Sequence, residues 1–377
     1  MSKKGRRSRI PRALRRDHIP VAFLEKGRPI RDKDSPCKIF VTTYDAERFE
    51  EREACDPAAL NTLLQSWRVV WIDVDGLGNG ETIEGIAKQF NIHHLVVEDI
   101  LAAHQRAKLE QYGKNFFLVT HLIPDKDVIE PKQISIYIGK NFVLSFQDEA
   151  EDGLKAVRER IRNEQSLIRA HGSDYLVYAI VDTVIDSYFP VLEKLGERLE
   201  DLEDLVIENP TRESIAQIHV IKRELLILRR AVWPLREAIN SLLRDGTSIL
   251  GEEAILHLRD SYDHAVRVLD FIETYREVGA DLMDVYLSSV SNRMNEVMKV
   301  LTIITTIFTP PMLIASIYGM TFDPNISPFN MPETKWYYGY PLALAVMLLS
   351  AFGMMTFLRW KGFLGARASR KPDGEAN

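Results

Sequence analysis

A stripe of polar and thioether side chains runs through an uncharged stretch near the C-terminal end of the chain. Its members are Asn295, Met298, Thr302, Thr305, Thr309, Met312 and Ser316. Because successive members are three and four residues apart, they would share one face of a helix. That face holds nearly all the hydroxyl groups of the stretch, with Thr306 as the exception. A polar face in lipid must meet other helices or water, so the stripe is a candidate functional feature.

Two interpretations of the stripe remain open. Its hydroxyl groups could join helices by hydrogen bonds across a bundle. Alternatively, several copies of the helix could surround a pore, with the stripe facing inward. A hydroxyl-lined pore without charges would suit an ion that keeps its water shell, and Mg²⁺ releases water reluctantly. In that pore Met298 and Leu301 are candidate hydrophobic constrictions.

The stripe lies mostly within the first of two long uncharged runs. The runs Val300–Met320 and Trp336–Leu358 have 21 and 23 residues. About 20 helical residues cross the hydrocarbon core of a bilayer. Aromatic residues flank the second run at both ends, as is typical of membrane interfaces. The sequence therefore predicts two transmembrane helices.

Basic residues decide the predicted orientation. They follow the second run at Arg359, Lys361, Arg367, Arg370 and Lys371, and precede the first at Arg293 and Lys299. By the positive-inside rule both termini are cytoplasmic and the connecting loop is outside. We thus expect a multi-pass protein of the cell (inner) membrane, in contact with membrane lipid.

A long stalk helix is expected to lead into the first span. No proline or strong turn signal occurs between Glu252 and Thr309. A second seam with spacings of three and four residues consists of Met283, Leu287, Val290, Met294, Val297 and Leu301. Such spacing favours bundling with copies of the same helix. Pro310 and Pro311 free backbone groups inside the span and are expected to kink it.

The residues ahead of the stalk combine strand and helix patterns. Strand patterns occupy 38–45, 68–77, 115–123, 133–139 and 141–146, and helix patterns occupy 82–90 and 93–103. This mixture predicts an α/β domain with one sheet. A charged helical region follows and is broken at Asn209-Pro210, which predicts an antiparallel helix pair. Thr211 is a candidate cap for its second helix, but only a partial one, since Ser214 stands where a capping box has Glu or Gln.

These patterns predict seven consecutive parts. They are a basic flexible arm (1–35), an α/β cytoplasmic domain (36–152), a charged helix pair (153–250), the stalk with transmembrane helix 1 (251–320), an extracytoplasmic loop (321–335), transmembrane helix 2 (336–358) and a basic tail (359–377).

The distribution of charge and the absence of known motifs argue against several classes of function. The first sixteen residues carry a charge of +8, so the rest sums to −14 within the formal net charge of −6. An acidic body without a recognised nucleic-acid-binding motif argues against a nucleic-acid partner. Two separated cysteines form neither a disulfide framework nor a metal motif. No nucleophile elbow, HExxH or kinase signature occurs, so we expect no enzyme and no small organic substrate.

Several stretches together resemble the CorA family of magnesium transporters. They include VVEDIL, HQRAKLE, QISIYIGKNFVLSFQ, SDYLVYAIVD, WPLREAI, SSVSNRMNEVMKVLTIITTIFTPPMLIASIYGM, MPE and WYYGYPLALAVM. The resemblance covers nearly the whole chain from about residue 36. It implies a funnel-shaped homopentamer with an α/β cytoplasmic domain, a long stalk helix and two transmembrane helices, the first of which lines the pore.

The resemblance also assigns roles at the outer mouth of the pore. Tyr318, Gly319 and Met320 match the Tyr-Gly-Met-Asn signature of the family, but Thr321 replaces its Asn. A Thr ring offers one shorter hydroxyl per subunit to the water shell of the ion. Asp323 and Glu333, repeated around the ring, would attract cations.

Regulatory divalent ions are implied between neighbouring cytoplasmic domains. Asp99 and Asp260 match one carboxylate pair of the family, and Glu98 and Asp182 match a second site. Oxygen ligands suit hard cations such as Mg²⁺. The implied logic is feedback, in which intracellular Mg²⁺ bridges subunits and holds the pore closed.

The main hypothesis is a divalent-cation channel that admits Mg²⁺ and is gated by intracellular divalent ions. Co²⁺ or Ni²⁺ are further candidate ions, and a cobalt, nickel or zinc transporter of the same superfamily is an alternative. The absence of Cys and His from the stripe disfavours a soft-ligand path. A membrane-anchored interaction protein without transport is the alternative from another class, but an anchor has no need of the stripe.

Overall fold

The structure of the chain is a computed structural model. It describes residues 37–53, 57–77, 80–102, 105–147, 153–320 and 329–363. The chain divides into two compact units, Met1–Met283 and Asp284–Asn377. The seven-part organisation expected from the sequence stays a prediction.

The first unit contains a seven-stranded sheet with the order β2-β1-β3-β7-β6-β5-β4. The strands are β1 Lys38–Tyr44, β2 Phe49–Glu53, β3 Val69–Asp75, β4 Lys108–Tyr112, β5 Asn115–Leu122, β6 Lys132–Ile138 and β7 Phe142–Gln147. Neighbouring strands are antiparallel except for the parallel pair β3 and β7. The five strands expected from the sequence are confirmed.

The sequence patterns missed β2 and β4, which are the two edge strands. The sequence of β2, FEERE, is charged at four of its five positions, and that of β4, KLEQY, carries Lys108 and Glu110. Charged side chains discourage an edge strand from pairing with other chains. The same charges remove the alternation of apolar and polar residues that would have predicted a strand.

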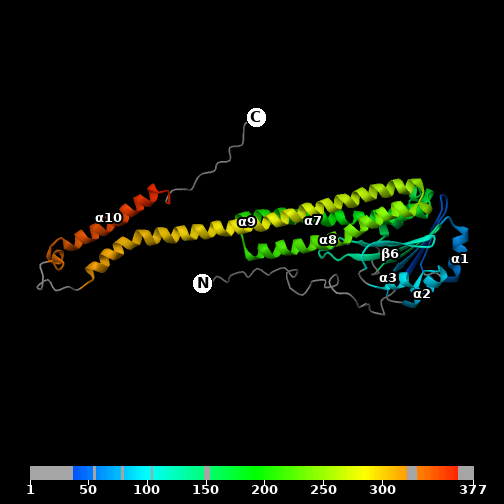
Figure 1. Ribbon diagram of the computed structural model, residues 1–377, viewed down its shortest axis with the longest axis horizontal. Coiled ribbons are helices and arrows are strands. Elements are labelled where there is room, and N and C mark those ends of the chain that lie inside the picture. The colour runs from blue at the N-terminus through cyan, green and yellow to red at the C-terminus, as the bar shows by residue number, and fades with distance from the viewer. Residues whose placement is uncertain are drawn as a thin grey trace, which may run out of the picture. The chain divides into compact units, whose positions relative to one another are not determined.

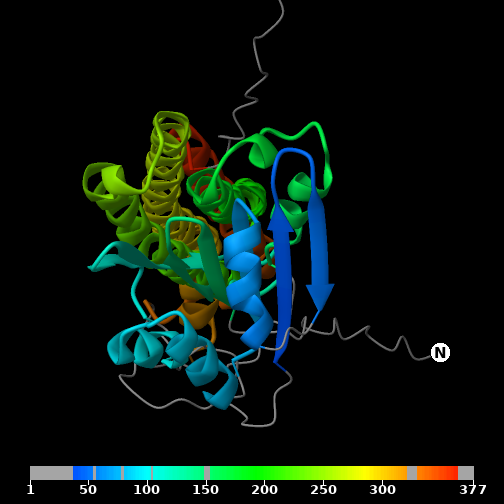
Figure 2. The same ribbon diagram turned by 90° about the vertical axis from the view of Figure 1, so that its right-hand side faces the viewer.

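Three short helices cover one face of the sheet. They are α1 Pro57–Ser66, α2 Gly80–Gln89 and α3 His94–Leu101. Because side chains alternate along a strand, Val70, Ile72 and Val74 of β3 point into one buried cluster with side chains of these helices. Figure 2 shows α2 and α3 in cyan on one side of the sheet and the green helices on the other. The two helices expected from the sequence are confirmed, and α1 was missed.

The other face of the sheet packs against further helices. They are α4 Lys155–Arg162, α5 Leu167–Ala170 and α6 Ser173–Asp186, followed by α7 Tyr188–Glu208 and α8 Arg212–Asp245. Most residues of α6 are buried, since this helix lies between the sheet and its neighbouring helices. A three-residue connection reverses the chain between α7 and α8, which contact each other along their length. The expected antiparallel pair is confirmed for α7 and α8 (Figure 1), but the charged region ahead of the break, described from residue 153, contains four helices instead of one.

The N-terminal cap of α8 differs from the expectation. The Thr211 hydroxyl accepts a hydrogen bond from Ser214 N at 3.2 Å, and Thr211 N donates to Ser214 Oγ at 3.4 Å. The expectation of a partial cap was therefore wrong. A serine hydroxyl is long enough to complete the box here, because Ser214 is buried against Thr211.

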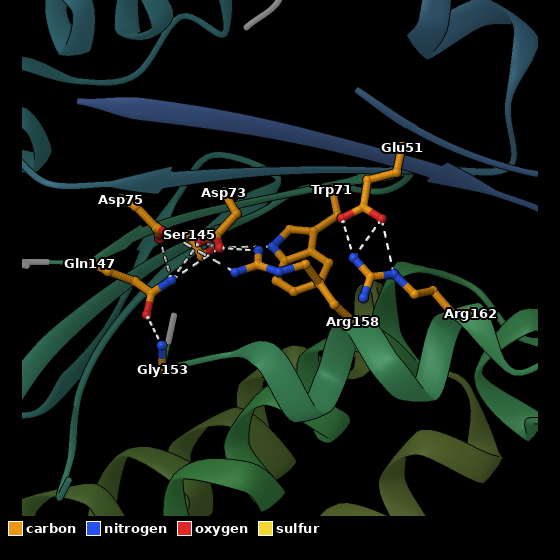
Figure 3. Close-up of polar contacts among 9 residues, drawn as sticks. All are labelled: Glu51, Trp71, Asp73, Asp75, Ser145, Gln147, Gly153, Arg158 and Arg162. Carbon is orange, nitrogen blue, oxygen red and sulfur yellow. Dashed lines mark hydrogen bonds and ion pairs between the residues drawn. The ribbon is translucent and has the colours of Figure 1, made fainter. Parts of the chain in front are cut away.

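A buried polar network joins the sheet to α4 (Figure 3). Asp73 accepts hydrogen bonds from Arg158 Nη1 at 2.5 Å, from Gln147 Nε2 at 3.0 Å and from the Ser145 hydroxyl. Gln147 Nε2 also donates to Asp75 at 2.6 Å. The Asp73 and Arg158 side chains are only 2 and 4 % exposed. Ionised groups at such depth require paired hydrogen bonds, so the network fixes α4 on β3 and β7.

A single helix, α9, runs from Glu252 to Tyr318, after the short helix η3 Gly246–Ser248. It begins in the first unit and ends in the second. The long helix expected from the sequence is confirmed. Its orange end turns away from its yellow part in Figure 1. A bend is expected there, since Pro310 and Pro311 remove two backbone donors.

The second unit also contains η4 Pro332–Lys335 and α10 Gly339–Trp360. The turn between them needs glycine at position 339. A Cβ atom there would lie 2.0 Å from the carbonyl oxygen of Glu333. Gly339 therefore allows the chain to enter α10 directly after η4.

Candidate functional site

The stripe residues lie on α9 within the second unit. Three of its threonine hydroxyls donate hydrogen bonds to carbonyl oxygens one turn earlier. Thr302 donates to Met298 O at 2.7 Å, Thr305 to Leu301 O at 2.9 Å, and Thr309 to Thr305 O at 2.6 Å. The hydroxyl hydrogens are thus used by their own helix. The hydroxyl oxygens of these three threonines keep lone pairs that can accept, so they form a row of hydrogen-bond acceptors within the stripe.

No residue in the most apolar window of α9 is buried by the rest of the chain, although several are half-buried. Met312 of the stripe is 74 % exposed, and Phe308 outside it is 66 % exposed. Met298 and Leu301, the expected constrictions, are also exposed. Exposed apolar area of this extent marks an interaction surface or a lipid-facing surface.

Three helices in the described part of the chain are long and apolar enough to cross a membrane. They are Ser173–Glu208, which comprises the consecutive helices α6 and α7, Glu252–Tyr318 and Gly339–Trp360. The most apolar window of the first is 67 % buried by the rest of the chain, against 0 % and 11 % for the other two. The first is therefore a core helix of the first unit. The remaining two contain the runs that the sequence predicted as transmembrane helices.

The structure describes only some of the residues expected at the outer mouth. Tyr318 ends α9, and Gly319 N and Met320 N still donate to the carbonyl oxygens of Ala315 and Ile317. Glu333 lies in η4, where its carbonyl oxygen accepts from Trp336 N. The expectations for Thr321 and Asp323 concern residues outside the described ranges.

The first expected regulatory carboxylate, Asp99, already has a cationic partner. Lys108 Nζ lies 2.7 Å from Asp99 Oδ2 and 2.8 Å from Glu110 Oε1. Burial opposes protonation of Lys108, but its hydrogen bonds to Asp99 and Glu110 raise its net pKa above the usual value. A metal ion at Asp99 would have to displace or share this ammonium group. Glu98, the preceding residue, is exposed.

The expected partner of Asp99 lies on α9. The side chain of Asp260 is 68 % exposed, and its Oδ2 lies 3.8 Å from His264 Nε2. Within the part of the chain that the structure describes, Asp99 and Asp260 share no cluster of metal-binding type. This agrees with their expected roles on different subunits, which stay a prediction.

One group of side chains could hold a metal ion within the described residues: Asp182, Asp186 and His264. One ligand atom from each lies within 4.8 Å of the others. Asp182 also receives a hydrogen bond from Arg160 Nη1 at 3.2 Å. Removal from water and the charge of Asp182 both raise the pKa of Asp186. A divalent cation would relieve the repulsion between these carboxylates.

The donor set of this group fits a divalent metal ion. Two carboxylates suit Mg²⁺ with several retained waters, and an imidazole also suits Co²⁺ or Ni²⁺. In the described residues the buried Nδ1 of His264 has no hydrogen-bond partner. Sequence reasoning identified Asp182 but missed Asp186 and His264. The spacing of four residues between the two aspartates on one helix was the available signal.

Comparison with known proteins extends this description. Residues 67–360 match the family model described as CorA-like Mg²⁺ transporter protein. The chain belongs to this family. It is 41 % identical over 330 residues to the cobalt/magnesium transport protein CorA of Thermotoga maritima, covering 87 % of this chain and 92 % of that protein.

Two further comparisons concern CorA of Methanocaldococcus jannaschii. Its cobalt/magnesium transport protein is 27 % identical to this chain over 290 residues, which cover 76 % of this chain and 90 % of that protein. The solved complete structure of that magnesium transporter matches with a TM-score of 0.73 at 23 % identity, covering 86 % of this chain and 98 % of that one. The likeness supports the CorA fold, an α/β domain with a long helix.

Proposed function

We propose that this chain transports divalent cations, with Mg²⁺ as its main cargo, through a pore lined by the stripe on α9. Membership of the CorA-like family and the cobalt/magnesium transport activity named for its relatives support this function. The observation that carries the proposal is the chemistry of the stripe. Its threonine hydrogens are bound within the helix, so its oxygens accept.

A row of acceptors matches the outer surface of a hydrated cation. Water molecules bound to Mg²⁺ direct their oxygen atoms to the ion and their hydrogens outward. The hydroxyl oxygens of Thr302, Thr305 and Thr309 can accept those hydrogens without replacing any water. Since dehydration of Mg²⁺ is costly, such a path lowers the barrier to passage. A Cys- or His-lined path would instead favour softer metals, and the stripe has neither residue.

The pore requires several copies of the chain. One copy leaves both α9 and α10 uncovered in the second unit, so lipid and neighbouring copies must cover them. The CorA resemblance implies five copies, and the positive-inside rule predicts both termini on the cytoplasmic side of the inner membrane. The stripe would face the central axis, and α10 would lie toward lipid. Met298 and Leu301 would form constrictions that close by excluding water.

Divalent ions on the cytoplasmic side would regulate the pore. Asp182, Asp186 and His264 offer oxygen and nitrogen ligands, while Asp99 and Asp260 would meet across a subunit boundary. Binding of Mg²⁺ between subunits would hold the closed state, since a ligand stabilises the state that it binds more tightly. Loss of the ion would release the subunits.

Uptake into proteoliposomes tests this function. The purified chain is reconstituted, and influx of Mg²⁺, Co²⁺, Ni²⁺ and Zn²⁺ is measured with internal indicators, beside Thr321→Asn. We expect Mg²⁺ influx that stops as internal Mg²⁺ rises. Influx of Mg²⁺ only in Thr321→Asn would mean that Thr321 disables the outer mouth. Absence of influx of every ion in both proteins would refute transport and favour an anchor.

A further inference from the structure

A cavity lies in the first unit between α8, the segment ahead of β4 and the end of β5. Its volume is about 370 Å³, within the range of small-molecule sites. Basic and aromatic side chains dominate its lining, which includes Arg106, His121, Arg229, Arg230 and Trp233. None of these residues belongs to the stripe or to the regulatory carboxylates.

The cavity has a buried inner wall and an accessible mouth. His121 on β5 is 2 % exposed, and Pro234 on α8 is also buried, so both form the inner wall. Trp233 is 46 % exposed and Leu226 is also exposed, so both lie at the mouth. The segment that carries Arg106 is fixed by a hydrogen bond from Gln105 N to Gln133 Oε1 at 2.9 Å. A ligand from solution can therefore enter past the Trp233 indole and reach the buried wall of the cavity.

Three arginines bring positive charge to a lining that is otherwise largely apolar. Arg229 Nε lies 2.7 Å from Glu273 Oε1, but the other oxygen of Glu273 binds Arg276 at 2.5 Å. One carboxylate thus serves two guanidinium groups. Within the described ranges, neither Arg106 nor Arg230 forms an ion pair. These two arginines leave positive charge available to an anion.

The aromatic side chain adds a second requirement for the ligand. The guanidinium of Arg229 lies 5.3 Å from the centroid of the Trp233 ring, as a cation–π contact. The half-exposed indole offers a flat surface beside the arginines. Inorganic phosphate would contact the arginines alone and leave the indole face of Trp233 in contact with water. An anion with a planar ring would use both.

We propose that this cavity binds a nucleotide, with its base against Trp233 and its phosphates on Arg106 and Arg230. The proposal concerns binding, without hydrolysis. It goes beyond cation transport, because the ligand is an organic anion and the site lies outside the pore and the metal cluster. Nucleoside triphosphates bind Mg²⁺, the ion that this chain is proposed to transport. A nucleotide site would therefore let the protein respond to the concentration of a compound that binds the same ion.

Calorimetric titration of the full-length protein with ATP in EDTA tests the proposal directly. EDTA removes divalent ions, so the metal cluster does not contribute. We expect saturable binding that weakens about tenfold or more in each of Arg106→Ala, Arg230→Ala and Trp233→Leu, since each removes a charged or stacking contact. Arg212→Ala is the matched control, because Arg212 is exposed on the same helix about 27 Å from Arg230. This variant should bind ATP as the wild type does.

Two partial ligands separate the contributions of phosphate and base. Inorganic triphosphate and adenosine should each bind at least about tenfold more weakly than ATP, because each satisfies half of the lining. Equal affinity for triphosphate and ATP would overturn the role of Trp233 and therefore the nucleotide proposal. Equal weakening in Arg212→Ala, or no saturation with ATP at about 10 mM, would also overturn it. Binding is measured without transport, so the result is independent of the proposed function.

Discussion

The helices α6 and α9 carry similar apolar runs with opposite surroundings. The apolar side chains of α6, such as Leu176, Ile180 and Val184, are fully buried within the first unit. Those of α9 in the second unit, such as Ile304 and Phe308, are more than half exposed. Apolar length alone therefore does not identify a membrane helix. The deciding property is whether the rest of the chain can bury the run.

The polar groups of the first unit and of α9 also differ in whether the chain itself satisfies their hydrogen bonds. In the first unit Asp73, Ser145, Gln147 and Arg158 satisfy one another behind the sheet (Figure 3). On α9 the threonines satisfy only their donors and keep acceptors free for other molecules. A closed network stabilises a fold, whereas an open row of acceptors is available to bind. Four substitutions test this contrast, from the largest expected effect to the smallest.

Breaking the closed network should have the largest effect. Arg158→Met removes the guanidinium and leaves Asp73 buried without its cation. The free energy of unfolding should fall by about 3–5 kcal/mol. Denaturant unfolding of the full-length protein in detergent measures the loss through tryptophan fluorescence.

Arg162→Met is the matched control on the same helix. Its pair with Glu51 is partly exposed, with Arg162 at 49 %, and should contribute less than about 1 kcal/mol. Equal destabilisation by the two substitutions would contradict the distinction between buried and exposed pairs drawn here.

Metal binding at the proposed cluster should stabilise the first unit by an intermediate amount. At a free Mg²⁺ or Co²⁺ concentration a hundred times its dissociation constant, the gain is about 2.7 kcal/mol. The double substitution Asp182→Asn/Asp186→Asn should remove this gain in thermal unfolding. Asp201→Asn, an exposed change on α7, should keep it. A metal-dependent gain that survives the double substitution would exclude this cluster as the site.

Removal of one acceptor from the stripe should slow transport. Thr302→Val keeps the shape of the side chain but loses the hydroxyl oxygen that would meet the hydrated ion. A loss of about 1 kcal/mol or slightly more corresponds to Mg²⁺ influx reduced about tenfold. Thr306→Val, outside the stripe, should leave influx within about twofold of the wild type. If the two substitutions slow influx equally, the stripe has no special role.

The cap of α8 should contribute the least. Thr211→Ala removes the hydroxyl that accepts from Ser214 N, which should cost about 1 kcal/mol of stability. Thr211→Ser keeps an oxygen there and should cost less. Both values follow from the unfolding midpoint in denaturant. A larger loss for serine than for alanine would be inconsistent with a capping role.

Much of the fold could be predicted because its signals are local. The central strands and α9 have apolar patterns within a few residues of one another. The edge strands β2 and β4 could not be predicted, since charges that protect an edge hide the strand pattern. The missed helix α1 is short and uncharged, but Leu60, Leu63 and Leu64 have helical spacing, which was the available signal.

The candidate sites also differ in whether their residues are close together in the sequence. The stripe was predictable because one helix carries all of its members. The cluster of Asp182, Asp186 and His264 needs two helices, and its histidine is far from the aspartates in sequence. The cavity at Trp233 likewise depends on the packing of α8 against β5. Contacts between distant segments are set by tertiary packing, which residue spacing does not encode.

Thiol labelling of the stripe tests the central claim most directly. Thr305→Cys and Ile304→Cys are made in a background without Cys37 and Cys55, and Mg²⁺ influx is measured with a charged, membrane-impermeant thiol reagent. The account predicts that the reagent blocks influx in Thr305→Cys and leaves Ile304→Cys unchanged, because only Thr305 faces the water-filled path. Block of Ile304→Cys, or unimpeded influx through labelled Thr305→Cys, would contradict a pore lined by the stripe.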